Sequence, residues 1–260
     1  MTLPATIVKK RPVITYYKSG DPTKNLNWIP KLEDINIIQT KVLTDQFIET
    51  VLLNKSRIFL HIVITGMAQT VFEPNIPSVK DMFFMIQKLI KGGFPQKQIL
   101  VVVNPVVPNE NGLKSLELLL RVFTEFKPLR LRFIRFNTLR YRQLEGGNKF
   151  VVASDNILAR PAIKGVMMYL TRASNFTKDY FNLIDRYKGI ISVDNGEEQL
   201  IGIRELIAFG YKNEWIEPDD TRTKLIEYEK QNKFKPIVKI ISNKFAVRCS
   251  NRCLLCNHKY

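Results

Sequence analysis

The last twelve residues of the chain contain all three of its cysteines. Cys249, Cys253 and Cys256 follow the spacing C-x3-C-x2-C. A lone buried cysteine behaves as a small hydrophobe, but three thiols on one short loop can converge on a single point, where their thiolates bind a metal. We therefore predict a metal centre held by these cysteines. The alternatives are a disulfide between two of the thiols, or three unliganded thiols; the odd number of cysteines favours the metal.

Two kinds of metal centre fit this spacing. A 4Fe-4S cluster held by three thiolates keeps one iron without a protein ligand, and that iron can bind a small molecule and exchange an electron. A structural zinc ion requires four protein donors, and His258 could supply the fourth beside the three cysteines. The spacing favours the iron-sulfur cluster, and zinc stays open as the alternative.

The cysteine motif resembles the cluster motif of radical S-adenosylmethionine enzymes, which mostly carry it near the N-terminus. A C-terminal position is found in the DUF1848 family, which looks like a circularly permuted relative of spore photoproduct lyase-type radical enzymes. Other stretches also resemble this group. Residues 35–41 are similar to its apolar strand ending in Thr-Lys, residues 62–66 to its strand ending in Thr-Gly, and residues 73–77 to its Glu-Pro-Asn-x-Pro turn into a helix.

The chain departs from the family pattern in three places. Residues 99–105 resemble the family's next strand, which usually ends in Arg-Tyr-Asp-Pro, but here it ends in Val-Val-Asn-Pro and lacks the arginine and the aspartate. The Thr-Lys pair is followed by Val42 and Leu43 instead of Asn-Pro. Leu255 stands beside the last cysteine, where the family often has an aromatic residue.

The resemblance implies a defined chemistry. The three thiolates would hold a 4Fe-4S cluster whose open iron chelates the amine and carboxylate of S-adenosyl-L-methionine. One electron from an external donor would then cleave a carbon-sulfur bond, and the resulting 5′-deoxyadenosyl radical would abstract hydrogen from a substrate. The protein's part in such chemistry is to orient the cofactor and to exclude water.

The elements expected to position this site alternate between strand and helix. Residues 57–64 are apolar on both faces apart from His61, which we expect to be an ordinary buried histidine. Strand patterns cover 35–38, 57–64, 98–103 and 129–136, and helical patterns cover 44–53, 78–91 and 112–126. This alternation predicts an α/β fold with parallel strands, in a sheet or a partial barrel. The resemblance favours a partial TIM-type (β/α) barrel, possibly circularly permuted.

We expect one domain spanning residues 1–260, and no repeat of fixed period is present. Residues 1–34 read as an irregular strand and loop, 35–145 as the first β/α units, 150–242 as the remaining units and 243–260 as the cysteine loop. The second half carries helical patterns at 157–172, 178–187, 197–209 and 221–232, and strand patterns at 189–193 and 235–241. The last of these strands would deliver the cysteine loop.

Barrel enzymes bind their ligands at the C-terminal ends of the strands. At the predicted strand ends, the candidate contacts to cofactor or substrate are Thr40, Lys41, Thr65, Gly66, Asn104 and Asn137. Gly66 would let a nucleoside approach the backbone closely, or it is simply a turn residue.

The chain is strongly basic, with 40 Lys and Arg against 24 Asp and Glu, a net charge of +16 and an isoelectric point near 9.8. Such an excess favours an anionic partner, most commonly nucleic acid; the alternative is a generally lysine-rich surface. Arginines interleaved with aromatic residues suit phosphates and stacked bases. The candidates are Arg130, Arg132, Arg135, Arg140 and Arg142, unless this stretch is only a solvated strand end and loop.

The resemblance implies a radical S-adenosylmethionine enzyme, and the basic charge favours a nucleic acid or nucleotide as the substrate that it repairs or modifies. One alternative is a non-catalytic nucleic-acid-binding protein with a C-terminal zinc knuckle of three cysteines and one histidine. Another is a barrel that keeps the cluster as a structural staple. The sequence has no apolar run long enough to span a membrane and no signal-peptide core, so we expect a soluble cytoplasmic protein. It also has no nucleotide-hydrolase or serine-esterase motif, which leaves these two activities without support.

Overall fold

The computed structural model describes residues 13–17, 22–70, 73–107, 109–125, 134–138, 140–143, 149–152, 175–187, 193–194 and 237–241. Seven strands in these ranges form one sheet in which every pairing is parallel. They are β1 Val13–Tyr17, β2 Ile35–Thr40, β3 Ile58–Val63, β4 Ile99–Val106, β5 Ile134–Thr138, β8 Val193–Asp194 and β9 Ile237–Ile241. The predicted α/β fold with parallel strands is confirmed.

The order of the strands across the sheet is β8-β5-β4-β3-β2-β1-β9. From β1 to β8, each further strand of this sheet lies on the same side of the strand before it; β6 and β7 belong to a separate sheet. The last strand breaks this rule, because β9 pairs with β1 at the other end of the sheet, with Val13 beside Ile237. Segments from the two ends of the chain therefore lie side by side.

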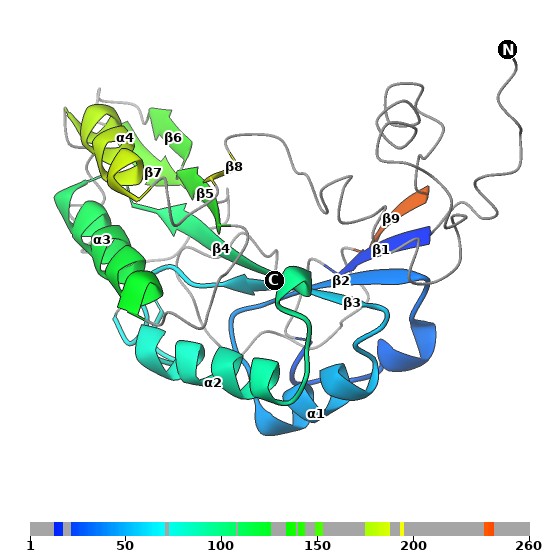
Figure 1. The fold of residues 1–260 in the computed structure, drawn as a ribbon. Helices are drawn as coiled ribbons and strands as arrows, with labels where there is room; N and C mark the ends of the chain where they lie inside the picture. Colours follow the sequence, from blue (N-terminus) through cyan, green and yellow to red (C-terminus); the bar gives the residue numbers. More distant parts are fainter. Residues whose placement is uncertain are drawn as a thin grey trace, which may run out of the picture.

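Four helices lie along one face of this sheet (Figure 1): α1 Asp45–Leu53, α2 Val79–Lys91, α3 Glu110–Glu125 and α4 Phe176–Arg186. Right-handed crossovers that always advance in the same direction put every helix on the same face. The hydroxyls of Thr44 and Ser78 accept hydrogen bonds from the backbone amides of Phe47 and Asp81 and so cap the N-termini of α1 and α2. Two 3-10 turns, Ile29–Lys31 and Gln96–Gln98, precede β2 and β4.

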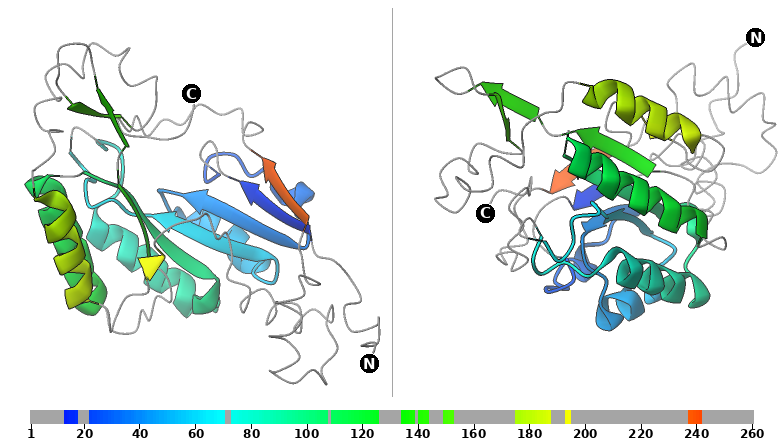
Figure 2. Two further views of the ribbon diagram at one scale, coloured as in Figure 1. Left: turned by 90° about the horizontal axis from the view of Figure 1, so that it is seen from above. Right: turned by 90° about the vertical axis from the view of Figure 1, so that its left-hand side faces the viewer.

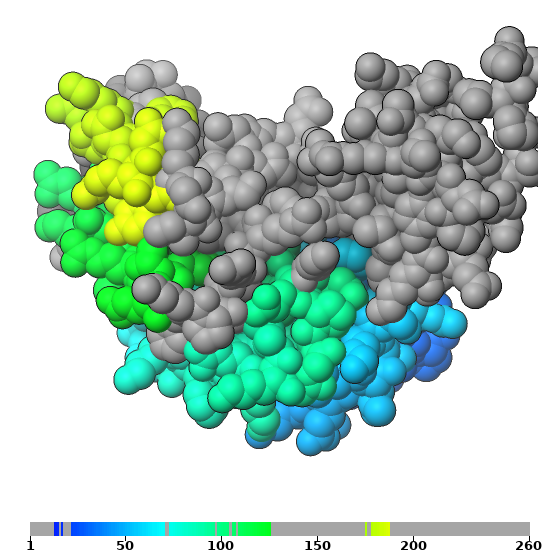
Figure 3. All heavy atoms as spheres, viewed as in Figure 1, coloured from blue at the N-terminus to red at the C-terminus, as the bar shows by residue number. Residues whose placement is uncertain are grey.

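The main core lies between the sheet and these helices. Alternate residues of the central strands, such as Ile38, Leu60 and Val101, pack into it with helix side chains. The Phe83 and Phe123 rings, from α2 and α3, meet edge to face with their centroids 4.6 Å apart. In the space-filling view the α1, α2 and α3 segments form one continuous outer surface (Figure 3).

The opposite face of the sheet changes from apolar to polar along the strands. Ile37 is level with Phe59, and the next pair along the same face is Gln39 with His61. His61 is 3% exposed, which confirms the expectation of a buried histidine. Because side chains alternate along a strand, the next positions on this face are Lys41, directly after β2, and Val63, the last residue of β3; Thr65 follows two residues later. The polar end of this face is the end where the parallel strands finish.

The structure differs from the sequence interpretation in three places. The segment 1–34 contains β1, a regular strand paired on both sides. Strand β4 continues past Asn104 to Val106, with a register shift against β5. The predicted boundary near residue 145 falls inside a hairpin made of β6 Arg140–Gln143 and β7 Lys149–Val152, which is separate from the main sheet (Figure 2).

The strand predicted at 235–241 and the helix predicted at 178–187 are confirmed as β9 and α4, while of the strand predicted at 189–193 only Val193 is described, in β8. The helices predicted at 157–172, 197–209 and 221–232, and the cysteine loop 243–260, lie outside the described residues. Within the described ranges, every helix is too short or too polar to cross a membrane.

Candidate functional site

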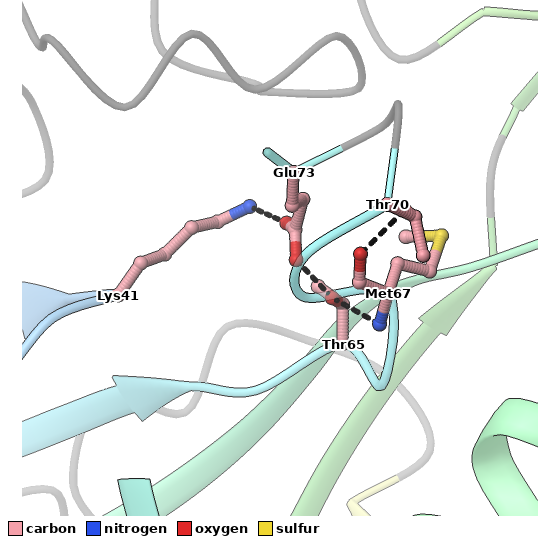
Figure 4. A network of polar contacts seen from close by, with 5 residues as sticks. All are labelled: Lys41, Thr65, Met67, Thr70 and Glu73. Carbon is pink, nitrogen blue, oxygen red and sulfur yellow. Dashed lines mark hydrogen bonds and ion pairs between the residues drawn. The ribbon is translucent and has the colours of Figure 1, made fainter. Parts of the chain in front are cut away.

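A buried ion pair lies where β2 and β3 finish. The Lys41 ammonium is 2.5 Å from Oε1 of Glu73, and the Thr65 hydroxyl donates a hydrogen bond to the other carboxylate oxygen, Oε2 (Figure 4). The side chains of Lys41 and Glu73 are 10% and 1% exposed. The carboxyl edge of a parallel sheet is where α/β proteins bind ligands, so this triad occupies the expected place for a functional site.

The loop between β3 and α2 brings Glu73 back to the sheet. The Thr65 hydroxyl accepts from the Met67 amide at 3.1 Å, which turns the chain directly after β3. The Gln69 amide donates to the Glu73 carbonyl at 2.9 Å, and the Thr70 hydroxyl donates to the Met67 carbonyl at 2.5 Å (Figure 4). These internal bonds fix the backbone of the loop, so that the Glu73 carboxylate is held at one place.

Gly66 is explained by this turn. Its φ of +76° is accessible to glycine at little cost, and a Cβ on it would lie 2.9 Å from the Ser115 carbonyl oxygen in α3. The space that a side chain would need is therefore occupied by α3. The structure favours the turn among the two roles considered for this residue.

A small apolar cluster lies beside the ion pair. Ile76, 5% exposed, packs against Val42 and Ala68, which follow Lys41 and precede Glu73 in the chain. The same two loops are thus joined twice, once by charge and once by apolar contact. A dry neighbourhood strengthens the attraction between the opposite charges and raises the cost of separating them.

Thr40 at the end of β2 has a local role in the structure. Its hydroxyl donates to the Val42 carbonyl at 2.7 Å and is 3.1 Å from the Val42 amide. This bonding closes a turn after β2 and aligns the next residue, Lys41. Thr40 and Gly66 therefore shape the backbone, while the Lys41 and Thr65 side chains both bind the Glu73 carboxylate.

The triad combines an ammonium, a carboxylate and a hydroxyl without net charge. A buried ion pair adds little stability over apolar residues of the same size, because both ions lose their hydration. The same groups, already dehydrated and fixed, are suited to hold a polar ligand that replaces part of the pair. The arrangement is therefore chemically suited to binding a charged or zwitterionic group.

The other candidate residues are placed less completely. Asn104 and Asn137 belong to β4 and β5, and Arg135 lies in β5 at the register position beside Val102. Arg140 and Arg142 lie in β6, in the hairpin. Arg130, Arg132, the three cysteines and His258 lie outside the described residues, so the predicted metal site stays a prediction. Within the ranges that are described, no three His, Cys, Asp or Glu side chains form a group that could hold a metal ion.

Glu73 is the residue that the sequence analysis did not select. It belongs to the quoted segment 73–77, but a glutamate between turn residues is usually exposed to solvent. The available signal was the pair of prolines at 74 and 77, which indicates a rigid turn. A rigid turn beside a strand end can hold its first residue against the sheet.

Comparison with known proteins gives no relative for this site. The chain matches no protein-family model, no curated protein and no solved structure. The functional argument therefore depends on the geometry and chemistry of the carboxyl edge and on the cysteine spacing.

Proposed function

We propose that this protein is a radical S-adenosylmethionine enzyme built on a partial, circularly permuted TIM-type barrel. One observation carries the proposal. Strand β9 is parallel to β1, so the chain leaves it at the carboxyl edge, where the Lys41–Glu73–Thr65 triad lies. The first cysteine, Cys249, follows the end of β9 after only seven residues, 242–248.

The distances are compatible with a shared site. Strand β9 is two places from β2 in the sheet, which corresponds to roughly 10 Å at about 4.8 Å per strand. The chain from Ile241 to Cys249 can span up to roughly 27 Å when extended. The cysteine segment is therefore long enough to reach the triad.

The strand order supports the permuted barrel. When β9 is counted first, every strand of the sheet follows in chain order up to β8. Most radical S-adenosylmethionine enzymes carry their cysteines after the first barrel strand, and here the cysteines follow β9. Residues 195–236 separate β8 from β9 in the chain, and a crossover unit needs about 30 residues. This length allows one further β/α unit, which would fill part of the gap between the two edge strands, β8 and β9.

Each part of the chain has a role in this proposal. Cys249, Cys253 and Cys256 would hold the 4Fe-4S cluster, and Lys41 would contact the carboxylate of S-adenosyl-L-methionine. Bound there, the cluster and cofactor would supply reductive cleavage of a carbon-sulfur bond, with the electron coming from an external donor. Glu73 and Thr65 hold the Lys41 ammonium in place, and the apolar cluster around Ile76 limits the access of water.

The proposed substrate is a nucleic acid or nucleotide. The net charge of +16 favours a polyanion. The hairpin that carries Arg140 and Arg142 begins two residues after β5 ends, and it therefore starts from the same carboxyl edge as the triad. Arginine side chains near this edge would suit phosphate groups.

Anaerobic purification and iron-sulfur reconstitution test the proposal. We expect a brown protein that forms 5′-deoxyadenosine when S-adenosyl-L-methionine and a reductant are added. Cys253→Ser should remove the colour. Lys41→Met should keep the colour but weaken cofactor binding, whereas Lys114→Met, an exposed lysine of α3, should change neither. A colourless protein with one equivalent of zinc would contradict the proposal.

A zinc-knuckle protein that binds nucleic acid without catalysis is the second candidate. His258 favours it as a fourth ligand, and so does the sequence of β4, which has Val102 and Asn104 where the resembling family has arginine and aspartate. His258→Ala should weaken zinc binding if this candidate is correct. It should leave an iron-sulfur cluster intact if the radical enzyme is correct.

A further inference from the structure

The opposite edge of the sheet, where the strands begin, carries a second group of cations. The loops after α1 and α2, residues 54–57 and 92–98, lie at this amino edge and contain no acidic residue. Lys55, Arg57 and Lys91 are exposed there. We call these three residues the amino-edge surface.

Among the residues that the structure describes, no carboxylate is paired with the side chains of this surface. Within the described ranges, Lys55, Arg57 and Lys91 form no ion pair and no side-chain hydrogen bond. Lys88, Arg121 and Arg186, on the outer helices, are each paired with a carboxylate. Three exposed cations, two from the loop after α1 and one from the last turn of α2, therefore keep their charge for an external anion.

Two buried amides hold the first loop in place. The Asn36 side chain, fully buried, donates to the Arg57 carbonyl at 3.1 Å. The Gln98 side chain, 6% exposed, donates to the carbonyls of Lys55 and Ile58, both at 2.6 Å. The backbone that presents Lys55 and Arg57 is thus fixed from both neighbouring strands, which reduces the entropy lost when an anion binds.

The second loop leaves room at the same place. Gly92 and Gly93 are exposed, and Gly93 has a φ of +90°. The Lys55 ammonium nitrogen is 3.3 Å from the position that a Gly93 Cβ would occupy. A side chain at residue 93 would therefore crowd Lys55, while the glycine pair leaves the cation approachable.

Helix dipoles do not account for the whole surface. Cations are favourable near helix C-termini, and this explains Lys91 in the last turn of α2. The effect falls off within one turn, whereas Arg57 lies directly before β3, four residues after α1 ends. The dipole also gives no reason for the amide bonds to the loop carbonyls.

We propose that the amino-edge surface binds the phosphate backbone of nucleic acid without reading its sequence. Phosphate contacts by lysine and arginine supply affinity and position but no sequence information. Strands of six residues separate this surface from the carboxyl edge by roughly 20 Å. The surface would act as an anchor for a long polyanion, and this role does not depend on the radical chemistry proposed above.

Charge reversal with a matched control tests this role. The triple variant Lys55→Glu, Arg57→Glu and Lys91→Glu is compared with Lys24→Glu, Lys114→Glu and Lys178→Glu, three exposed lysines on separate segments. Both variants lower the net charge from +16 to +10, so any effect of overall charge is the same. Binding of duplex DNA, single-stranded DNA and single-stranded RNA of random sequence is measured by fluorescence anisotropy across a salt series, and circular dichroism checks folding.

We expect the amino-edge variant to lose at least tenfold in affinity near physiological salt. The slope of log affinity against log salt for duplex DNA should fall by about three, one for each lost phosphate contact. The control variant should lose much less. An equal loss in both variants, binding only to anionic lipid vesicles, or no nucleic-acid binding by the wild type would overturn the proposal. Loss of the iron-sulfur colour alone would bear only on the radical chemistry.

Discussion

The Lys41–Glu73 pair gives the sharpest prediction about this protein. We consider Glu73→Gln, Lys41→Met and the double variant, which together form a double-mutant cycle. Glutamine keeps an oxygen that can accept from the Thr65 hydroxyl, so the first change mainly removes the charge. Methionine keeps most of the length of lysine without its ammonium.

The structure sets the expected size of the effect. At 2.5 Å and an effective dielectric constant of about 20, the Coulomb attraction is about 7 kcal/mol, and dehydration of each ion offsets several kcal/mol of it. Removing one partner leaves the other charge buried and unpaired, which costs about 3–5 kcal/mol of unfolding free energy. Removing both charges should cost about 1–2 kcal/mol, so the coupling energy should be about 4 kcal/mol or more.

Urea unfolding followed by circular dichroism measures these free energies. A coupling energy below about 0.5 kcal/mol would refute the reasoning, because it would mean that water reaches both charges in the folded protein. The exposed pair Lys88–Asp45, which joins α2 to α1 at 2.7 Å, provides the internal comparison. Its cycle should give less than about 1 kcal/mol.

The same double variant separates a structural role from a binding role. If the pair only joins the two loops, the double variant should recover stability and bind S-adenosyl-L-methionine as the wild type does. If Lys41 contacts the cofactor carboxylate, stability should recover while cofactor affinity stays low. Isothermal titration with the reconstituted protein distinguishes these outcomes.

Three further predictions concern stability. Thr15→Val should raise the unfolding free energy by about 1 kcal/mol, because the fully buried Thr15 hydroxyl has no hydrogen-bond partner in the described structure. A lower unfolding free energy in urea than that of the wild type would count against this. Gly66→Ala should lower it by about 1–3 kcal/mol, since alanine is strained at a φ of +76° and its Cβ would press on Ser115, and an unchanged urea midpoint would contradict that geometry. Burial raises the pKa of Tyr180 to about 12 from its ordinary value of 10, so its contribution to stability is complete below pH 10 and is lost as the pH rises towards 12. The stability difference between wild type and Tyr180→Phe should therefore depend on pH in that window and nowhere below it.

Local sequence signals predicted most of the described helices closely. The pattern at 44–53 became Asp45–Leu53 with Thr44 as the cap, and the pattern starting at Ser78 became Val79–Lys91, ended by glycine. Caps, apolar spacing and glycine stops act within one or two turns, so they can be read without knowing the rest of the fold. Strand β4 was predicted too short because Asn104 and Pro105 resemble a strand break.

Strand β1 shows the limit of local sequence patterns, because a strand was expected in residues 1–34 but neither its bounds nor its partners could be predicted. Its five residues lie in a segment rich in turn residues, and its parallel partners begin at residue 35 on one side and residue 237 on the other. Parallel strands need long connections, so their pairing is decided by contacts distant in the chain. The hairpin formed by β6 and β7 was not predicted either, since this stretch was interpreted as an arginine-rich surface for an anionic ligand or as a solvated strand end and loop.

The sequence alone determined the parallel α/β pattern, the basic character of the chain and the spacing of the three cysteines, because each can be read from the order and types of the residues. The tertiary structure decided that Lys41 and Glu73, 32 residues apart, form a buried pair with Thr65. It also decided that β9 lies beside β1. A charged side chain is buried only when distant segments supply its partner and exclude water, and this requires the completed fold.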